Sequence, residues 1–118
     1  MIPEYEKTLK EITSPLSSIG FEMKTNTDFK AVFMSDGGWK ILLEGDRYYR
    51  PLIEITISPP HDNSEYSLRI IIKCYETIEK EKQLPPTAIN QVEFLLKNFH
   101  SWVKNTQTYK STYDKLNA

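Results

Sequence analysis

Hydrophobic and polar residues alternate along the stretch from Trp39 to Ile57, on both sides of a polar interruption. The apolar members stand at odd-numbered positions: Trp39, Ile41 and Leu43 before the interruption, and Ile53, Ile55 and Ile57 after it. A period of two that is rich in β-branched residues is typical of half-buried β-strands. The stretch therefore predicts two strands, joined by the polar and aromatic loop 45–51, around which the rest of the chain is arranged.

The N-terminal segment has a different period, with apolar residues at every third or fourth position: Ile2, Tyr5, Leu9, Ile12, Leu16 and Ile19. This spacing predicts an amphipathic helix, and Gly20 suits the left-handed residue that ends it. Pro15 falls inside the pattern, where it has no N–H group to donate. We therefore expect a kink, or a restart of the helix with Ser14 as its cap.

Two further short strands are expected between this helix and Trp39, over residues 21–25 and 29–35, with a turn at Asp36-Gly37-Gly38. With three-residue turns and a five-residue loop 46–50, the register pairs Phe21 with Phe33, Met23 with Ala31, Phe33 with Ile41, Ala31 with Leu43, Leu43 with Ile53, and Ile41 with Ile55. Side chains alternate between the faces of a sheet, so all of these residues would share one face.

Residues 66–75 continue the alternation at even-numbered positions, with Tyr66, Leu68, Ile70, Ile72 and Cys74. We expect a fifth strand here, with Ile57 opposite Tyr66, Ile55 opposite Leu68, and Ile53 opposite Ile70. Five strands that follow the order of the chain form an antiparallel meander.

From Thr87 onward the period of three to four returns, in Ile89, Val92, Leu96, Phe99 and Val103. One helix over residues 87–116 would be about 45 Å long, more than a domain of this size spans. We expect a break near residues 105–108, with the tail as a separate short helix. The sequence thus predicts one α+β domain over residues 1–118, with an N-terminal helix and a long C-terminal helix packed on one face of a five-stranded antiparallel meander.

The opposite face of this sheet is expected to carry an apolar strip among charged residues. The strip consists of Val32, Leu42, Leu52 and Ile71, with Val32 opposite Leu42, Leu52 opposite Ile71, and Glu54 paired with Arg69 beside them. An apolar patch ringed by charge is typical of partner-binding surfaces, although a helix or the tail could equally cover it.

The loop Arg47-Tyr48-Tyr49-Arg50 is the second candidate for recognition. Arginine and tyrosine are favoured interface anchors because they offer forked donors or large area at low entropic cost. The alternative is a solvated turn with a tyrosine folded back on the core.

Composition limits the classes of function. The net charge of −1, with acidic and basic residues mixed, argues against binding to duplex DNA. No apolar run is long enough for a membrane span, and Glu4 and Glu6 stand where a secretory signal needs a basic region. The single cysteine excludes an intrachain disulfide. We therefore expect a cytoplasmic protein that binds a protein partner, with a homodimer left open.

Catalytic and cofactor chemistry find little support in the sequence. Cys74 lies at a buried position, and no spacing brings His61 or His100 to it. His61, Asp62 and Glu65 lack a recognised metal-ligand spacing. No phosphate-binding loop or nucleophile elbow is present. The prediction is a protein that is not an enzyme and that has neither a cofactor nor a metal.

The order of elements resembles that of small bacterial immunity-type proteins from polymorphic or contact-dependent toxin systems. The resemblance rests on the helix that ends at Gly20-Phe21, the meander through Gly38-Trp39 and Tyr49-Arg50-Pro51, and the long C-terminal helix. It implies a protein that binds one cognate toxin and blocks it.

Two other binding functions stay open from the residues alone. A small ligand could occupy a pocket lined by Phe21, Phe33, Tyr66 and Trp102. A single-stranded nucleic acid could bind through Arg47 and Arg50.

Overall fold

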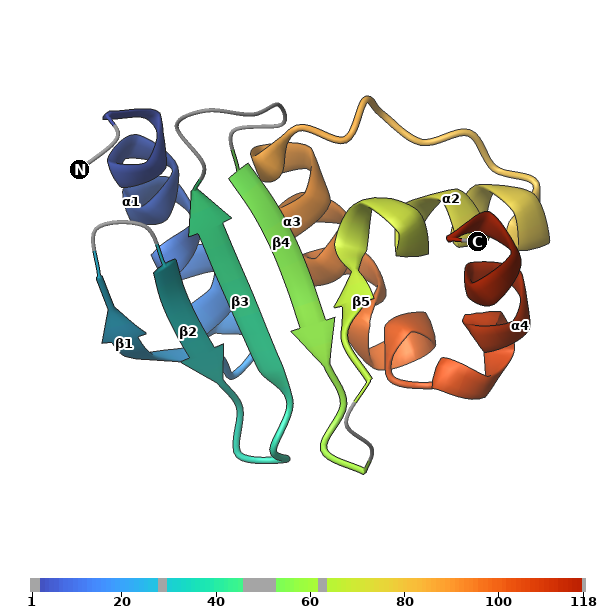
Figure 1. The fold of residues 1–118 in the computed structure, drawn as a ribbon, viewed down its shortest axis with the longest axis horizontal. Helices are drawn as coiled ribbons and strands as arrows, with labels where there is room; N and C mark the ends of the chain where they lie inside the picture. Colours follow the sequence, from blue (N-terminus) through green and yellow to red (C-terminus); the bar gives the residue numbers. More distant parts are fainter. Residues whose placement is uncertain (1–2, 28–29, 46–52, 62–63, 118) are drawn as a thin grey trace.

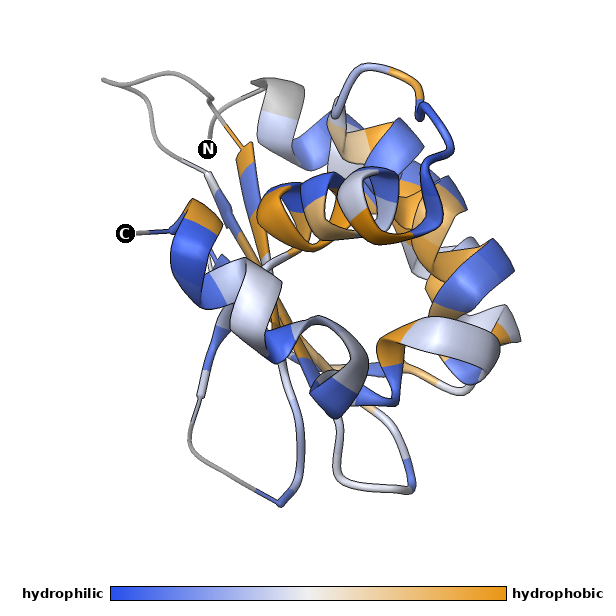
Figure 2. Cartoon of the chain, turned by 90° about the vertical axis from the view of Figure 1, so that its right-hand side faces the viewer, coloured by the Kyte–Doolittle hydropathy of each residue, from blue (hydrophilic) through white to orange (hydrophobic). Residues whose placement is uncertain are grey.

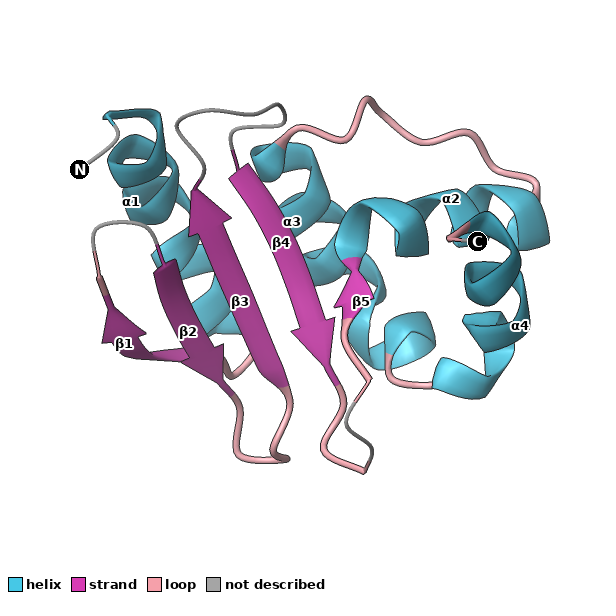
Figure 3. Ribbon diagram, in the orientation of Figure 1, coloured by secondary structure: helices cyan, strands magenta, loops and turns pink. Residues whose placement is uncertain are grey.

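The computed structural model describes residues 3–27, 30–45, 53–61 and 64–117, and within them the fold is α+β (Figure 1). The elements are α1 (Pro3–Ser18), β1 (Glu22–Asn26), β2 (Lys30–Met34), β3 (Lys40–Gly45), β4 (Ile53–Ser58), β5 (Tyr66–Ser67), α2 (Leu68–Glu79), α3 (Ala88–Asn98), the π-helical turn η1 (Phe99–Val103) and α4 (Thr106–Leu116). The strands form one antiparallel sheet in the order β1-β2-β3-β4-β5, which confirms the predicted meander (Figure 3).

Helix α1 buries the apolar stripe that predicted it, with Tyr5, Leu9, Ile12 and Leu16 all in the core. The helix ends as expected at Gly20, whose φ is +93°. The N–H groups of Gly20 and Phe21 donate to the carbonyl groups of Ser17 and Leu16, each at 3.0 Å. This is a Schellman motif, in which only glycine takes the left-handed position without strain.

Of the two outcomes expected at Pro15, a kink or a restart with Ser14 as its cap, the restart does not occur. One continuous helix spans Pro3–Ser18 with Pro15 inside it, and Ser14 is an exposed residue of its interior, not a cap. A proline removes one helical hydrogen bond. The buried stripe on both sides of Pro15 supplies packing that outweighs this loss, because tertiary packing provides most helical stability.

The register of β2 and β3 is the predicted one, with Phe33 opposite Ile41 and Ala31 opposite Leu43. Between β3 and β4 the register differs by two residues, because Ile41 lies opposite Ile57 and Leu43 lies opposite Ile55. A shift of two keeps every side chain on its predicted face. The odd-numbered apolar residues of these strands are therefore buried together, as expected.

Strand β1 also differs from the expected register. Met23 lies opposite Phe33 and Asn26 lies opposite Ala31, with an irregularity between Met23 and Thr25. An extra residue in one strand of a pair is a β-bulge, which local alternation does not reveal. Phe21 itself precedes the strand and is fully buried.

The predicted strand over residues 66–75 is the main error. Ile57 lies opposite Tyr66 as expected, but β5 ends at Ser67 and helix α2 begins at Leu68. The expected pairs of Ile55 with Leu68 and of Ile53 with Ile70 are therefore absent. A ten-residue strand would have extended beyond the six-residue β4, whereas the helix buries Leu68, Ile71, Ile72 and Cys74 together.

The helices lie behind the sheet, with α1 and α3 against the buried face and α2 and α4 beyond the β5 edge (Figure 1). Seen from the right-hand side of Figure 1, most of the helices lie to one side of the strands, and the helix that leads to the C-terminus passes in front of them (Figure 2). The expected break in the C-terminal helix occurs at Asn105, which precedes α4, and α4 packs on α2. None of the described helices combines the length and the apolar character that crossing a membrane requires.

Candidate functional site

The outer face of the sheet, turned away from α1 and α3, is the first candidate surface. It comprises Lys30, Val32, Met34, Lys40, Leu42, Glu44, Glu54, Thr56 and Ser58, the side chains of β2, β3 and β4 that alternate with the buried ones. Val32 and Leu42 lie directly opposite each other, as predicted, and both are partly exposed. Met34 beside them has 37% of its surface exposed.

Charged side chains border this apolar group. The ammonium group of Lys30 is 3.9 Å from a carboxylate oxygen of Glu44, and both side chains are about half exposed. Lys40 lies opposite Met34 at the other end of the strands. An exposed ion pair contributes little to stability, so the fold does not depend on this border.

Ile71 does not belong to the outer face. It lies on α2 and is fully buried in the core, because residues 68–79 form a helix instead of a strand. For the same reason the predicted cross-strand pair of Glu54 and Arg69 is absent. The carboxylate of Glu54 instead accepts a hydrogen bond from the hydroxyl group of Ser67 at 2.9 Å. The other predicted recognition residues, Arg47, Tyr48, Tyr49, Arg50 and Leu52, lie outside the described residues.

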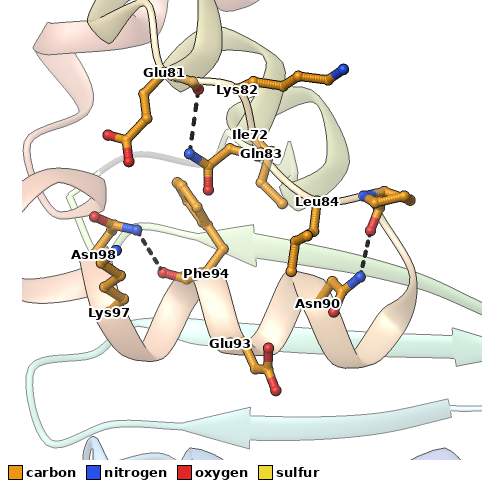
Figure 4. A pocket seen from close by; sticks show the side chains of 11 residues that line it. Ile72, Glu81, Lys82, Gln83, Leu84, Asn90, Glu93, Phe94, Lys97 and Asn98 are labelled. Carbon is orange, nitrogen blue, oxygen red and sulfur yellow. Dashed lines mark hydrogen bonds between the residues drawn. The ribbon is translucent and has the colours of Figure 1, made fainter.

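A groove of about 610 Å³ lies between α2, α3 and the connector 80–87 (Figure 4). Ile72, Leu84 and Phe94 give it an apolar lining, and Figure 4 shows Phe94 pointing into it. Four charged side chains, two acidic and two basic, complete its rim: Glu81, Lys82, Glu93 and Lys97. The groove has the size of a ligand site, but its charges balance and favour no particular ligand.

Hydrogen bonds hold the connector in place over this groove. The N–H of Gln83 donates to the carboxylate of Glu76 at 2.9 Å, and the amide of Asn90 donates to the carbonyl of Pro85 at 2.8 Å. Thr87 caps α3, since its hydroxyl oxygen accepts the N–H of Asn90 at 3.2 Å. These hydrogen bonds attach the connector 80–87, which forms the mouth of the groove, to α2 and α3.

A second cleft, of about 380 Å³, lies at the end of the sheet where the turn 35–38 approaches η1. Its lining includes both histidines of the chain, His61 and His100, together with Asp36, Trp39 and Lys104. From the sequence we treated the two histidines separately and did not predict this site. Nothing local indicates it, because His61 follows β4 whereas His100 lies in η1, on the far side of α2 and α3 in the chain.

The space between the sheet and the helices, which the sequence left open as a ligand pocket or a closed core, is filled by its own side chains. Phe21 and Phe33 are fully buried, and Tyr66 and Trp102 nearly so. The ring of Trp102 stacks on Tyr109 with centroids 4.9 Å apart, and Tyr66 packs edge-on against Tyr109 and Tyr113. These aromatic residues make a closed core, in which such pairs add stability beyond the area they bury.

Cys74 has the inert environment that its position predicted. The side chain is fully buried on α2, and burial raises the pKa of its thiol to about 11. The reactive thiolate is therefore disfavoured at neutral pH. Among the described residues, no three His, Cys, Asp or Glu side chains are grouped so as to hold a metal ion.

Comparison of the chain with protein-family models, with curated protein sequences and with solved structures finds no match.

Proposed function

We propose that this chain is a protein-binding module, most concretely an immunity protein that binds and neutralises a cognate toxin. The observation that carries the proposal is the composition of the outer face. Val32, Leu42 and Met34 form a partly exposed apolar group on adjacent strands, bordered by Lys30, Lys40 and Glu44. The described helices leave this face open, because α1 and α3 pack on the opposite one (Figure 1).

The arrangement suits a protein more than a small molecule. Protein interfaces have an apolar centre and a polar rim, and the strands of a sheet hold such side chains on a rigid, extended surface. The flanking lysines and Glu44 would select a partner of complementary charge and exclude others. The segment with Arg47, Tyr48, Tyr49 and Arg50 joins β3 to β4 in the chain, so it starts and ends at this same sheet.

The test begins with the product of the gene next to this one in its native genome. That product should arrest growth when it is expressed alone, and co-expression of this chain should restore growth. The double variant Val32→Asp with Leu42→Asp should lose the protection, because it places two charges at the centre of the apolar group. Binding of the purified pair by calorimetry should weaken by at least about 2 kcal/mol, the loss typical of an interface hot spot.

The matched control is Gln107→Asp with Ser111→Asp, which adds the same charge at exposed positions of α4. This variant should protect as well as the wild type, and both variants should keep the helical circular-dichroism spectrum. Protection that survives the outer-face variant would show that a different surface carries the function. A neighbouring product that kills regardless of this chain would overturn the immunity function itself.

A separate variant tests whether the segment Arg47-Tyr48-Tyr49-Arg50 belongs to the interface. Replacing Tyr48 and Tyr49 together by alanine should weaken the cognate complex by more than about 1 kcal/mol. Unchanged affinity with an unchanged fold would remove the loop from the interface and leave the outer face as the binding surface.

A further inference from the structure

The two histidines of the chain line the same cleft at the end of the sheet, together with a lysine. His61 follows β4, His100 lies in η1, and Lys104 directly follows η1. Their side chains are exposed at the surface of the cleft. Three separate segments, the turn 35–38, the residues after β4, and η1, are therefore needed to build this site.

Two aromatic rings, Trp39 and Phe99, line the cleft beside its basic groups. Trp39 packs edge-on against Phe99, with centroids 5.3 Å apart, and both rings are buried. The His61 ring lies 6.5 Å from Trp39, and the His100 ring lies 5.2 Å from Phe99. The Lys104 ammonium group is 5.4 Å from the centre of the Phe99 ring. The basic groups thus surround one buried aromatic pair.

The π-helical turn places two of the three basic groups. The N–H of Lys104 donates to the carbonyl of Phe99 at 3.0 Å, a bond across five residues, which is one residue wider than in an α-helix. Such turns are rare in proteins, and those that occur are often found at functional sites. Here the turn presents His100 and Lys104 to the cleft while Phe99 and Trp102 remain in the core.

Basic side chains outnumber acidic ones in this cleft. Of the described side chains that line it, His61, His100 and Lys104 are basic, whereas Asp36 is acidic. The Nε2 atom of His61 is also 3.5 Å from the Oγ1 atom of Thr106 on α4.

We propose that this cleft binds the phosphate group of a small phosphorylated ligand. Imidazole and ammonium groups are single-point donors, and here they come from two separate segments, the residues after β4 and the η1 region. Several separate donors suit a tetrahedral anion with several oxygens. A planar carboxylate is better matched by the forked donors of arginine, and no arginine lines the described cleft. The proposal is independent of the protein-binding function, because it uses no residue of the outer face.

The experiment is a proton NMR titration of the full chain with inorganic phosphate at constant ionic strength and fixed pH. The two histidines give two separate imidazole signals. Both should shift along a saturable curve. Acetate at the same concentration should shift neither signal along a saturable curve.

Variants assign the binding to the cleft. Lys104→Gln and His100→Gln should each weaken phosphate binding by about fivefold or more, and Asp36→Asn should strengthen it, since charged hydrogen bonds contribute most. Lys7→Gln is the matched control, because Lys7 is 80% exposed on α1, away from the cleft. A control that weakens binding as much as Lys104→Gln would overturn the site, as would shifts that do not saturate.

Adenosine and its monophosphate identify what the cleft recognises. The monophosphate should bind at least as tightly as inorganic phosphate, and adenosine should not bind. Equal binding of adenosine and of its monophosphate would overturn the proposal, because recognition would then lie on the base.

Discussion

The hydroxyl oxygen of Tyr113 accepts the backbone N–H of Ser67 at 2.6 Å, although the two residues are 46 positions apart. Ser67 is the last residue of β5 and immediately precedes α2. The side chain of Ser67 does not cap the helix, since its hydroxyl donates to Glu54. Tyr113 therefore ties α4 to the point where the chain changes from strand to helix.

Replacing Tyr113 by phenylalanine should lower the free energy of unfolding by about 1–3 kcal/mol, because the Ser67 N–H is left without its acceptor. Urea denaturation followed by circular dichroism measures the change. The control is Tyr75→Phe, whose hydroxyl donates to Glu81 at an exposed position and whose loss should cost under about 0.5 kcal/mol. Equal effects of the two variants would contradict a structural role for the bond.

The turn between β2 and β3 depends on one of its two glycines. Gly38 has a φ of +85°, and a Cβ atom there would lie 2.9 Å from Cβ of Pro60. Gly38→Ala should therefore destabilise the protein by about 2 kcal/mol or more. Gly37→Ala is the control, because its nearest contact would be 3.8 Å away, at Trp39. A thermal melt in which both variants lose the same stability would contradict this assignment.

Ile71 and Leu42 should respond differently to truncation. Ile71→Ala removes a fully buried side chain on α2 and should cost about 2–5 kcal/mol, including the cavity it leaves. Leu42 is only partly buried on the outer face, so Leu42→Ala should cost under about 1.5 kcal/mol. Denaturant midpoints measure both. A small effect at Ile71 would place that side chain outside the core.

The native thiol of Cys74 should react slowly with a thiol reagent at pH 8, because it is fully buried and its pKa is raised to about 11. Reaction in denaturant should be fast. Absorbance at a fixed reagent concentration gives both rates. Native labelling as fast as in denaturant would show an accessible thiolate and would revive a catalytic function for Cys74.

Stability should also fall in alkaline solution through this thiol. The folded pKa is raised above the ordinary value of 9.0, so the folded state holds its proton more tightly than the unfolded state. The stability that the protonated Cys74 thiol contributes to folding is fully present below pH 9. It is lost as the pH rises through about 11. Over this range the stability difference between the wild type and Cys74→Ala should shrink by about 2–3 kcal/mol. A pH-independent difference would contradict the shift.

Prediction from the sequence succeeded where a local pattern allowed one structure. The pairing of Val32 with Leu42 followed from alternation and from the three-residue turn at Asp36-Gly37-Gly38, so this part of the outer face could be located in advance. Residues 66–75 allowed two structures. The even-numbered positions suited a strand, whereas Leu68, Ile71, Ile72 and Tyr75 have helical spacing as well.

The sequence by itself determined which side chains of β2, β3 and β4 face the core, because alternation is a property of neighbouring residues in one strand. It also determined the end of α1 at Gly20 and the turn at Gly38, where the backbone needs a positive φ. Only the tertiary structure decided that residues 68–79 are helical and that His61 and His100 line the same cleft. Both depend on the packing of segments distant in the chain, since burial of Ile71 and the approach of η1 to the sheet exist only once the layers are assembled.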